Sequence, residues 1–239
     1  MIEGLLPLLL VLPMAGFVIT AFFGRRFGKQ AHWIPVGAIF IVWVIAMLVV
    51  FNVLTGSAPI LPGGEETHGY AVGPWTWIPA GDFHVDLGLI VDPLTACLLI
   101  VVTTIGLLVH VYSIGYMSHD PGYWRFFAYL NLFMFSMLLL VLADSWLVVF
   151  VAWELVGLSS YLLIGFWYRK RSAALAAKKA FIVNRVGDVG FILGIMLIFV
   201  SLGTLDIREV IERIGELDAT TITIALGAEA KRGLARATR

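Results

Sequence analysis

Charged residues are scarce in this sequence. They make up 13% of its 239 residues, whereas hydrophobic residues make up 60%. Soluble domains carry about 25% charged residues, so this composition is unfavourable for a water-soluble globule. Positive and negative charges balance to a formal net charge of zero. Bulk electrostatics therefore do not indicate a nucleic-acid partner, and we expect none.

Cysteine and the common cofactor motifs are also nearly absent. The one cysteine, Cys97, lies in an apolar run and excludes a disulfide framework and a thiolate metal cluster. We expect Cys97 to be a small residue of the hydrophobic core. The sequence has no glycine-rich phosphate loop, no CxxC pair and no HExxH motif. These absences argue against nucleotide, iron–sulfur and zinc sites, so any redox step is expected on a partner protein.

Long hydrophobic runs dominate the chain instead. A helix that spans a bilayer needs about 20 mostly apolar residues, and backbone polar groups in hydrocarbon must be paired within it. The sequence therefore predicts an all-α integral membrane protein with an antiporter-like multi-helix bundle. The first run lacks a basic leader and a cleavage pattern, so we expect it to remain as a helix. Six runs qualify, at residues 4–23, 33–54, 90–115, 125–142, 145–168 and 179–202.

The segments between these runs alternate in charge. The first, third and fifth loops together contain nine Lys and Arg residues, whereas the remaining loops and the segment after the sixth run contain two. Lys and Arg concentrate in cytoplasmic loops, so we expect the N-terminus to lie outside. The external loop, residues 55–89, ends in an alternating pattern that predicts a short β-hairpin with its turn at 79–82.

The last residues follow another pattern. Residues 219–228 begin to look like a seventh span, but ten apolar residues are too few to cross a bilayer. Basic residues then recur up to residue 239. We expect residues 1–218 to form the transmembrane part, and residues 219–239 to be the start of a seventh helix that ends in a basic tail.

One carboxylate, Glu154, falls in the middle of the fifth run. A charge at the centre of a bilayer costs about 2.5–3.5 kcal/mol on insertion scales, so its presence indicates a role. Tyr161 shares its helix face and offers a hydroxyl group. We interpret Glu154 as a proton-carrying residue, with Tyr161 as a possible neighbour on the path. The alternative is a structural carboxylate that is bonded to a neighbouring helix.

Three further polar residues lie in apolar runs. Arg185 and Asp188 are spaced i, i+3 in the sixth run, so they share a face and can pair within one helix. We assign both to the proton path; a local structural pair, or an arginine that extends to the cytoplasmic end, is the alternative. His110 ends the third run and is a possible proton relay, because imidazole titrates near neutrality; simple hydrogen bonding is the alternative.

Four stretches carry a family resemblance, at residues 107–117, 125–133, 153–168 and 185–188. They are similar, in order and spacing, to subunit L of proton-translocating NADH:quinone oxidoreductase, respiratory complex I. The resemblance covers about residues 1–218. It implies an antiporter-like bundle with inverted repeats, in which Glu154 is the key glutamate of the fifth helix and Asp188, with Arg185, is the charged site of the sixth. The family pairs this glutamate with a lysine on the seventh helix.

The resemblance also implies a function. The chain would be a proton-translocating membrane subunit of the enzyme, with NADH, FMN, iron–sulfur clusters and quinone on partner subunits and no cofactor of its own. Its partners would be the other membrane subunits of complex I and the lipid bilayer. The implied location is the bacterial plasma membrane, equivalent to the inner mitochondrial membrane. Two alternatives remain: a large subunit of a multisubunit Na+/H+ antiporter, and a truncated fragment without transport activity.

Overall fold

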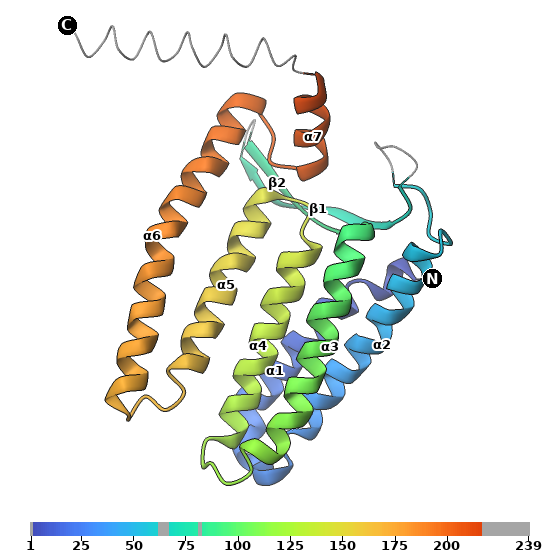
Figure 1. Ribbon diagram of the computed structural model, residues 1–239. Coiled ribbons are helices and arrows are strands. Elements are labelled where there is room, and N and C mark those ends of the chain that lie inside the picture. Colours follow the sequence, from blue (N-terminus) through green and yellow to red (C-terminus); the bar gives the residue numbers. More distant parts are fainter. Residues whose placement is uncertain (1, 62–66, 81–82, 217–239) are drawn as a thin grey trace, which may run out of the picture.

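Six long apolar helices form the body of the part of the chain that the structure describes (Figure 1). The computed structural model describes residues 2–61, 67–80 and 83–216. Each helix is long and apolar enough to cross a membrane, which confirms the prediction of an all-α integral membrane protein. The helices are α1 (Leu8–Phe27), α2 (Trp33–Leu54), α3 (Pro93–Tyr116), α4 (Tyr123–Leu142), α5 (Trp146–Ile164) and α6 (Arg171–Leu202).

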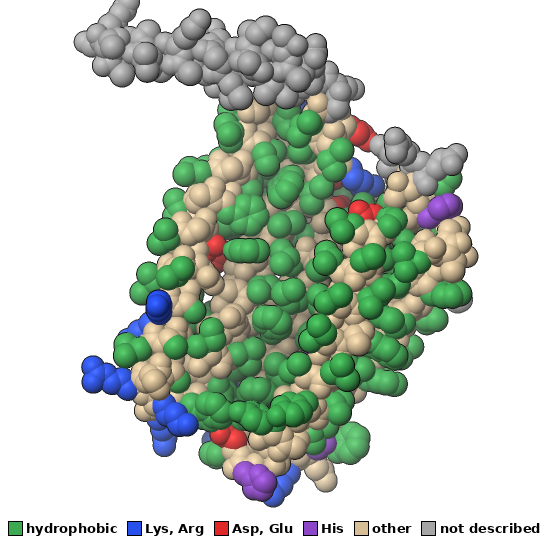
Figure 2. Space-filling model, in the orientation of Figure 1, with side chains coloured by type: hydrophobic (Ala, Val, Ile, Leu, Met, Phe, Trp, Pro, Cys, Tyr) green, Lys and Arg blue, Asp and Glu red, His purple; other side chains and the backbone are tan. Residues whose placement is uncertain are grey.

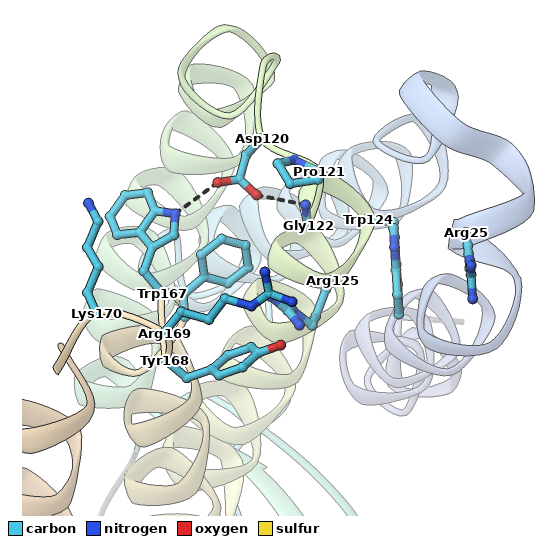
Figure 3. Close-up of a pocket in the computed structure, with 11 residues that line it drawn as sticks. Arg25, Asp120, Pro121, Gly122, Trp124, Arg125, Trp167, Tyr168, Arg169 and Lys170 are labelled. Atoms are coloured by element: carbon cyan, nitrogen blue, oxygen red, sulfur yellow. Dashed lines mark hydrogen bonds between the residues drawn. The ribbon is translucent and has the colours of Figure 1, made fainter.

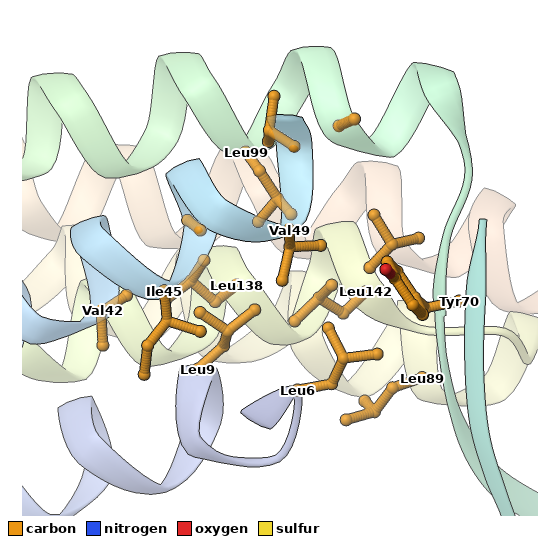
Figure 4. Packing of buried hydrophobic residues seen from close by; sticks show 14 of the residues in the cluster. Leu6, Leu9, Val42, Ile45, Val49, Tyr70, Leu89, Leu99, Leu138 and Leu142 are labelled. Carbon is orange, nitrogen blue, oxygen red and sulfur yellow. The ribbon is translucent and has the colours of Figure 1, made fainter. Parts of the chain in front are cut away.

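The helices divide into a bundle and an outlying pair. Helices α1, α2, α3 and α4 pack on one another, and their core includes Leu9, Val49, Leu99 and Leu138 (Figure 4). Helix α5 packs on α4, and α6 packs mainly on α5 at the edge of the molecule (Figure 1). Consequently α6 presents most of its surface outward, which suits a helix surrounded by lipid or by other membrane helices.

The prediction that Cys97 belongs to the core is wrong. Its side chain is exposed on α3, although the neighbouring Ala96 and Leu99 are fully buried. A membrane helix presents apolar residues to lipid as well as to its neighbours, so an apolar run does not indicate which face is buried.

Several helix bounds differ from those expected. Helix α6 begins at Arg171, ahead of residue 179, because residues 173–177 are strong helix formers. Helix α3 begins at Pro93, where the Asp92 carboxylate accepts a hydrogen bond of 2.6 Å from the Thr95 N–H. Helix α5 ends at Ile164 and not at residue 168. Short 3-10 turns, η1 (Glu3–Leu5) and η2 (Gly28–Gln30), flank α1.

A β-hairpin covers the end of the bundle at which α4 ends and α5 begins (Figure 1). Strands β1 (Tyr70–Ala80) and β2 (Phe83–Val91) pair antiparallel, so the hairpin is longer than expected. Part of the expected turn, residues 81–82, lies outside the described residues. Helix α7 (Ile207–Glu216) follows α6 and was not expected. The expected seventh span and basic tail also lie outside the described residues.

Asp144 connects the hairpin to the junction between α4 and α5. Its buried carboxylate accepts a hydrogen bond of 2.9 Å from the Gly88 N–H of β2. Its backbone carbonyl accepts another, of 2.8 Å, from the Ile207 N–H at the start of α7. Burial raises the pKa of the Asp144 carboxyl, and the nearby Asp206 carboxylate raises it further, whereas the Gly88 bond and Arg208 act in the opposite direction.

Lys and Arg side chains gather at the opposite end of the bundle, at the lower left and bottom of Figure 2. This end contains the C-terminus of α1, the turn between α3 and α4 and the loop between α5 and α6. The basic loops that alternate along the sequence therefore meet at one end of the structure. Their assignment to the cytoplasmic side stays a prediction from charge.

Replacing Gly88 by alanine is expected to destabilise the hairpin junction. A Cβ atom at this position would lie 1.7 Å from the Asp144 Oδ2 atom, so the carboxylate or the strand must move. We expect Gly88→Ala to lower the free energy of unfolding by about 1–3 kcal/mol, the range for overpacked sites. Thermal unfolding of the purified protein in detergent measures the change. The matched control is Gly37→Ala, whose Cβ meets nothing within 4 Å; equal melting of both variants contradicts the assignment.

Asp144 is expected to make stability dependent on pH in an unusual direction. Its raised pKa means that the folded protein holds this proton more tightly than the unfolded chain, so ionisation opposes folding. The penalty grows as pH rises from the ordinary value of 3.8 through the raised value. Asp144→Asn keeps an acceptor for Gly88 but does not titrate. We therefore expect the melting temperature of Asp144→Asn to rise relative to that of the parent as the pH increases from 3.8 through the raised pKa of Asp144.

The matched variant, Asp144→Ala, removes the acceptor as well as the charge. It should melt below Asp144→Asn at every pH, because it leaves the buried Gly88 N–H without its partner. If the difference in melting temperature between Asp144→Asn and the parent is the same at every pH, titration of the Asp144 carboxyl does not contribute to stability.

Candidate functional site

Glu154 lies near the middle of α5, and its carboxylate contacts α6. It is the ninth residue of α5, roughly 12 Å along the helix from its hairpin end at 1.5 Å per residue. Its side chain is half-buried, with 22% of its surface exposed. The sequence of α5 contains no other charged residue, so a partner for this carboxylate must come from another helix.

Arg185 of α6 supplies that partner. Its guanidinium forms an ion pair with the Glu154 carboxylate across the helix contact. On the other side, its Nε atom lies 3.6 Å from the Asp188 Oδ2 atom, within the same helix. Arg185 therefore lies between two carboxylates and does not extend to the basic end. Glu154 thus has a cationic partner within the described part of the chain, distinct from the seventh-helix lysine that the family resemblance implies.

Aromatic side chains complete the surroundings of the cluster. The Trp153 Nε1–H donates a hydrogen bond of 3.1 Å to the Asp188 Oδ1 atom. The Phe181 ring lies 4.5 Å from the centre of the Arg185 guanidinium, a cation–π contact. Tyr161 reaches the cluster only indirectly, since its ring packs 5.5 Å from that of Phe181. Sequence analysis missed Trp153 and Phe181 because their partners lie on other turns or helices.

An open cavity of about 580 Å³ lies beside the cluster, between α5 and α6. Trp153 and Asp188 line it, together with Asn184 and Phe191. Asp188 is nearly buried, with 9% of its side chain exposed, and the cavity is the space next to it. This arrangement gives one of the two carboxylates an approach from the flank of the helix pair.

The charge count of the cluster defines what it can do chemically. Two carboxyl groups, of Glu154 and Asp188, share one guanidinium. The cluster is neutral when one carboxyl carries a proton and has a charge of −1 when neither does. A net charge in a low-dielectric environment is unfavourable, whereas a nearby cation favours the ionised form of a carboxyl. The geometry therefore suits reversible uptake of one proton.

His110 lies apart from this cluster, in the contact between α3 and α4. It is buried, and its Nδ1 atom is 2.7 Å from the Gly106 carbonyl, which can only accept. Nδ1 therefore carries the proton, and Nε2 accepts from the Asn131 Nδ2–H at 3.4 Å. No hydrogen bond in the described part of the chain connects His110 to Glu154. These contacts favour a histidine that is simply hydrogen-bonded over one that relays protons.

Metal ligation has no support among residues 2–61, 67–80 and 83–216. Within these ranges, no group of three His, Cys, Asp or Glu side chains has the arrangement of a metal site. The expectation that the chain binds no cofactor of its own stays a prediction.

Two family profiles match the sequence. Residues 77–127 match the family described as "NADH-Ubiquinone oxidoreductase (complex I), chain 5 N-terminus". Residues 143–234 match the one described as "NADH:quinone oxidoreductase/Mrp antiporter, TM". The second match contains Glu154, Arg185 and Asp188.

Individual proteins are similar over most of the chain. Subunit L of NADH-quinone oxidoreductase from Mycobacterium tuberculosis (strain CDC 1551 / Oshkosh) is 44% identical over 229 residues, which are 94% of this chain and 35% of that protein. Subunit L from Escherichia coli K12 is 41% identical over 87% of this chain and 33% of that protein. A solved structure of the Mrp complex from Dietzia sp. has a TM-score of 0.68 and 28% identity, covering 86% of this chain and 20% of the other. The chain spans about a third of the length of these curated relatives.

The ion pair across α5 and α6 is expected to appear as coupling between substitutions. Glu154→Gln and Arg185→Gln should each destabilise the protein. The double variant should lose less than the sum, because it leaves only Asp188 without its cation, whereas Arg185→Gln alone leaves both carboxylates without one. We expect a coupling energy of about 1 kcal/mol, within the usual range for side chains in contact. Unfolding in detergent measures all four proteins of the cycle.

The control cycle pairs Glu154→Gln with Lys178→Gln. Lys178 is exposed on the same helix as Arg185, nearer its basic end. These two substitutions should be additive, since the side chains share no contact. Additivity in the Glu154–Arg185 cycle as well would mean that the ion pair contributes nothing to the α5–α6 contact.

Proposed function

Because this chain belongs to the subunit L, or chain 5, family of NADH:quinone oxidoreductase, we propose that it forms part of a proton-translocating membrane subunit of that enzyme. The proposed role is to couple quinone reduction elsewhere in the complex to proton movement through buried charged residues. The observation that carries the proposal is the cluster of Glu154, Arg185 and Asp188 at mid-height in α5 and α6. Intramembrane ionisable groups commonly mark proton paths.

The proposed mechanism is electrostatic. While Arg185 pairs with Glu154, the glutamate remains ionised and Asp188, held by Trp153, is the carboxyl that can accept a proton. If Arg185 moves toward Asp188, Asp188 releases its proton, and Glu154, which has lost its cation, takes one up. Return of Arg185, or approach of a lysine from a seventh helix as in the family, releases the proton of Glu154; once Arg185 has returned, Asp188 is again the carboxyl that takes one up. Each movement of Arg185 thus exchanges one proton at each carboxyl, and the proposal assigns no redox step to this chain.

The proposed setting follows from the same family. The relatives are named as subunits of multisubunit enzymes, so we expect other membrane subunits as neighbours, and NADH, FMN, iron–sulfur clusters and quinone on partner chains. Bacterial relatives favour the bacterial plasma membrane as the location. Since the chain spans about a third of the relatives' length, transport also depends on what the remainder of such a subunit contributes.

A large subunit of a multisubunit Na+/H+ antiporter is the second candidate. It is favoured by the likeness to the Mrp complex and by the family description that includes Mrp antiporters. The identity to subunit L, 44% against 28% for the Mrp chain, favours the first proposal. Sodium-dependent proton transport without NADH oxidation would support the antiporter instead.

The proposal predicts that Glu154→Gln, made in a full-length subunit within the assembled complex, abolishes proton pumping. Glutamine is nearly isosteric but cannot carry a proton, so NADH oxidation and assembly should largely persist while the proton gradient falls to the level of uncoupled vesicles. The measurement is acidification of inverted membrane vesicles during NADH oxidation. Glu3→Gln, at an exposed carboxylate in the η1 turn before α1, is the matched control and should pump normally. Undiminished pumping by Glu154→Gln would remove Glu154 from the path.

A further inference from the structure

A pocket of about 700 Å³ lies at the basic end of the helices, and Glu154 is not among the residues that line it. The end of α1, the start of α4 and the segment after α5 form its walls (Figure 3). Four cationic side chains line the pocket, alongside a single carboxylate, Asp120. The cationic residues are Arg25, Arg125, Arg169 and Lys170.

The lone carboxylate does not neutralise these cations. The two oxygens of Asp120 accept hydrogen bonds from the Gly122 N–H at 2.7 Å and from the Trp167 Nε1–H at 2.8 Å. Within the described part of the chain, no carboxylate forms an ion pair with any of the four cations. The pocket therefore has an excess of positive charge and room for an anion.

Arg125 is the most firmly held of the cations. Its guanidinium lies 5.0 Å from the centre of the Phe166 ring and 5.3 Å from that of Tyr168. Its Nε atom is buried and has no hydrogen-bond partner. The guanidinium groups of Arg125 and Arg169 lower the pKa of the Tyr168 phenol. The electrostatics at this point of the pocket thus favour a negatively charged oxygen.

A second pocket, of about 530 Å³, adjoins the first and shares Arg25, Trp124 and Asp120 with it. It contributes another cation, Lys29, and His119. Arg25 therefore separates two neighbouring basic hollows. Both lie where the helices end, which is the level of the lipid headgroups, and tryptophan side chains typically occupy this level.

We propose that the two hollows bind an anionic phospholipid with two phosphates, such as cardiolipin, one phosphate in each. Arginine forks match phosphate oxygens, and basic pockets between membrane helices bind such headgroups on the cytoplasmic side. A phospholipid fits better than an acidic protein segment because the hollows open at the ends of apolar helices, where acyl chains can follow the exposed surface. The lipid holds the ends of α1, α4 and the α5–α6 loop together and does not depend on proton transport.

The test measures lipid binding to the complete, delipidated complex by native mass spectrometry. Cardiolipin, phosphatidylglycerol and phosphatidylcholine are added separately. We expect the parent to bind one cardiolipin that Arg125→Gln/Arg169→Gln binds about 30-fold more weakly, since each Lys or Arg near an anionic lipid contributes about a fivefold factor. Phosphatidylglycerol, with one phosphate, should bind more weakly than cardiolipin, and phosphatidylcholine should not occupy the site.

The matched control is Arg26→Gln/Arg171→Gln. It removes two exposed positive charges at the same end of the molecule that line neither hollow, so cardiolipin binding should remain. Equal weakening in both double variants means diffuse attraction and overturns the proposal, as does equal binding of phosphatidylcholine. Retention of the lipid by both double variants also overturns it and leaves an acidic partner segment as the occupant.

If Arg125→Gln/Arg169→Gln does not assemble, a single substitution tests the proposal. Arg169 is exposed, so Arg169→Gln is expected to fold, to weaken cardiolipin binding about fivefold, and to regain it as Arg169→Lys. Unchanged binding in Arg169→Gln overturns the proposal without the double variant.

Discussion

The ion pair between Glu154 and Arg185 is the contact on which the outer part of this membrane protein depends. Helix α6 packs mainly on α5 and exposes most of its length, so the interface between them is narrow. Placing a carboxylate at its centre is tolerable only because a guanidinium faces it from the other helix. The same pair therefore joins the helices and places Asp188 and Trp153 around a site that can hold one proton.

The two ends of the molecule differ in how their polar groups are paired. At the hairpin end, Asp144 and the neighbouring bridges connect β2, the α4–α5 junction and the start of α7 through buried hydrogen bonds. At the basic end, cations line hollows and few carboxylates oppose them. At the hairpin end the protein's own groups satisfy these hydrogen bonds, whereas the basic end exposes positive charge toward the proposed membrane surface. The α5–α6 cluster lies between these ends.

Hydropathy and loop charge were sufficient to predict the six helices. The energetic cost of a carboxylate inside a membrane helix was sufficient to identify Glu154 as a candidate site residue. The lipid environment makes these signals strong, because few residue types are tolerated there. What the sequence could not indicate were partners on different helices. The spacing of Arg185 and Asp188 predicted a local pair, yet the contact with Glu154 depends on how α5 and α6 pack. The burial of Asp144 and the exposure of Cys97 likewise depend on tertiary packing, which an apolar run does not specify.

The depth of Glu154 has an electrical consequence. As the ninth of nineteen residues of α5, it lies near the middle of the voltage drop across an energised membrane. A proton that reaches it from either face crosses roughly half of that drop. A full crossing at 100 mV is worth about 2.3 kcal/mol, so half is worth about 1.2 kcal/mol, roughly an eightfold change in occupancy. The charge of the α5–α6 contact, and with it the packing of the most exposed helix, thereby becomes sensitive to membrane voltage.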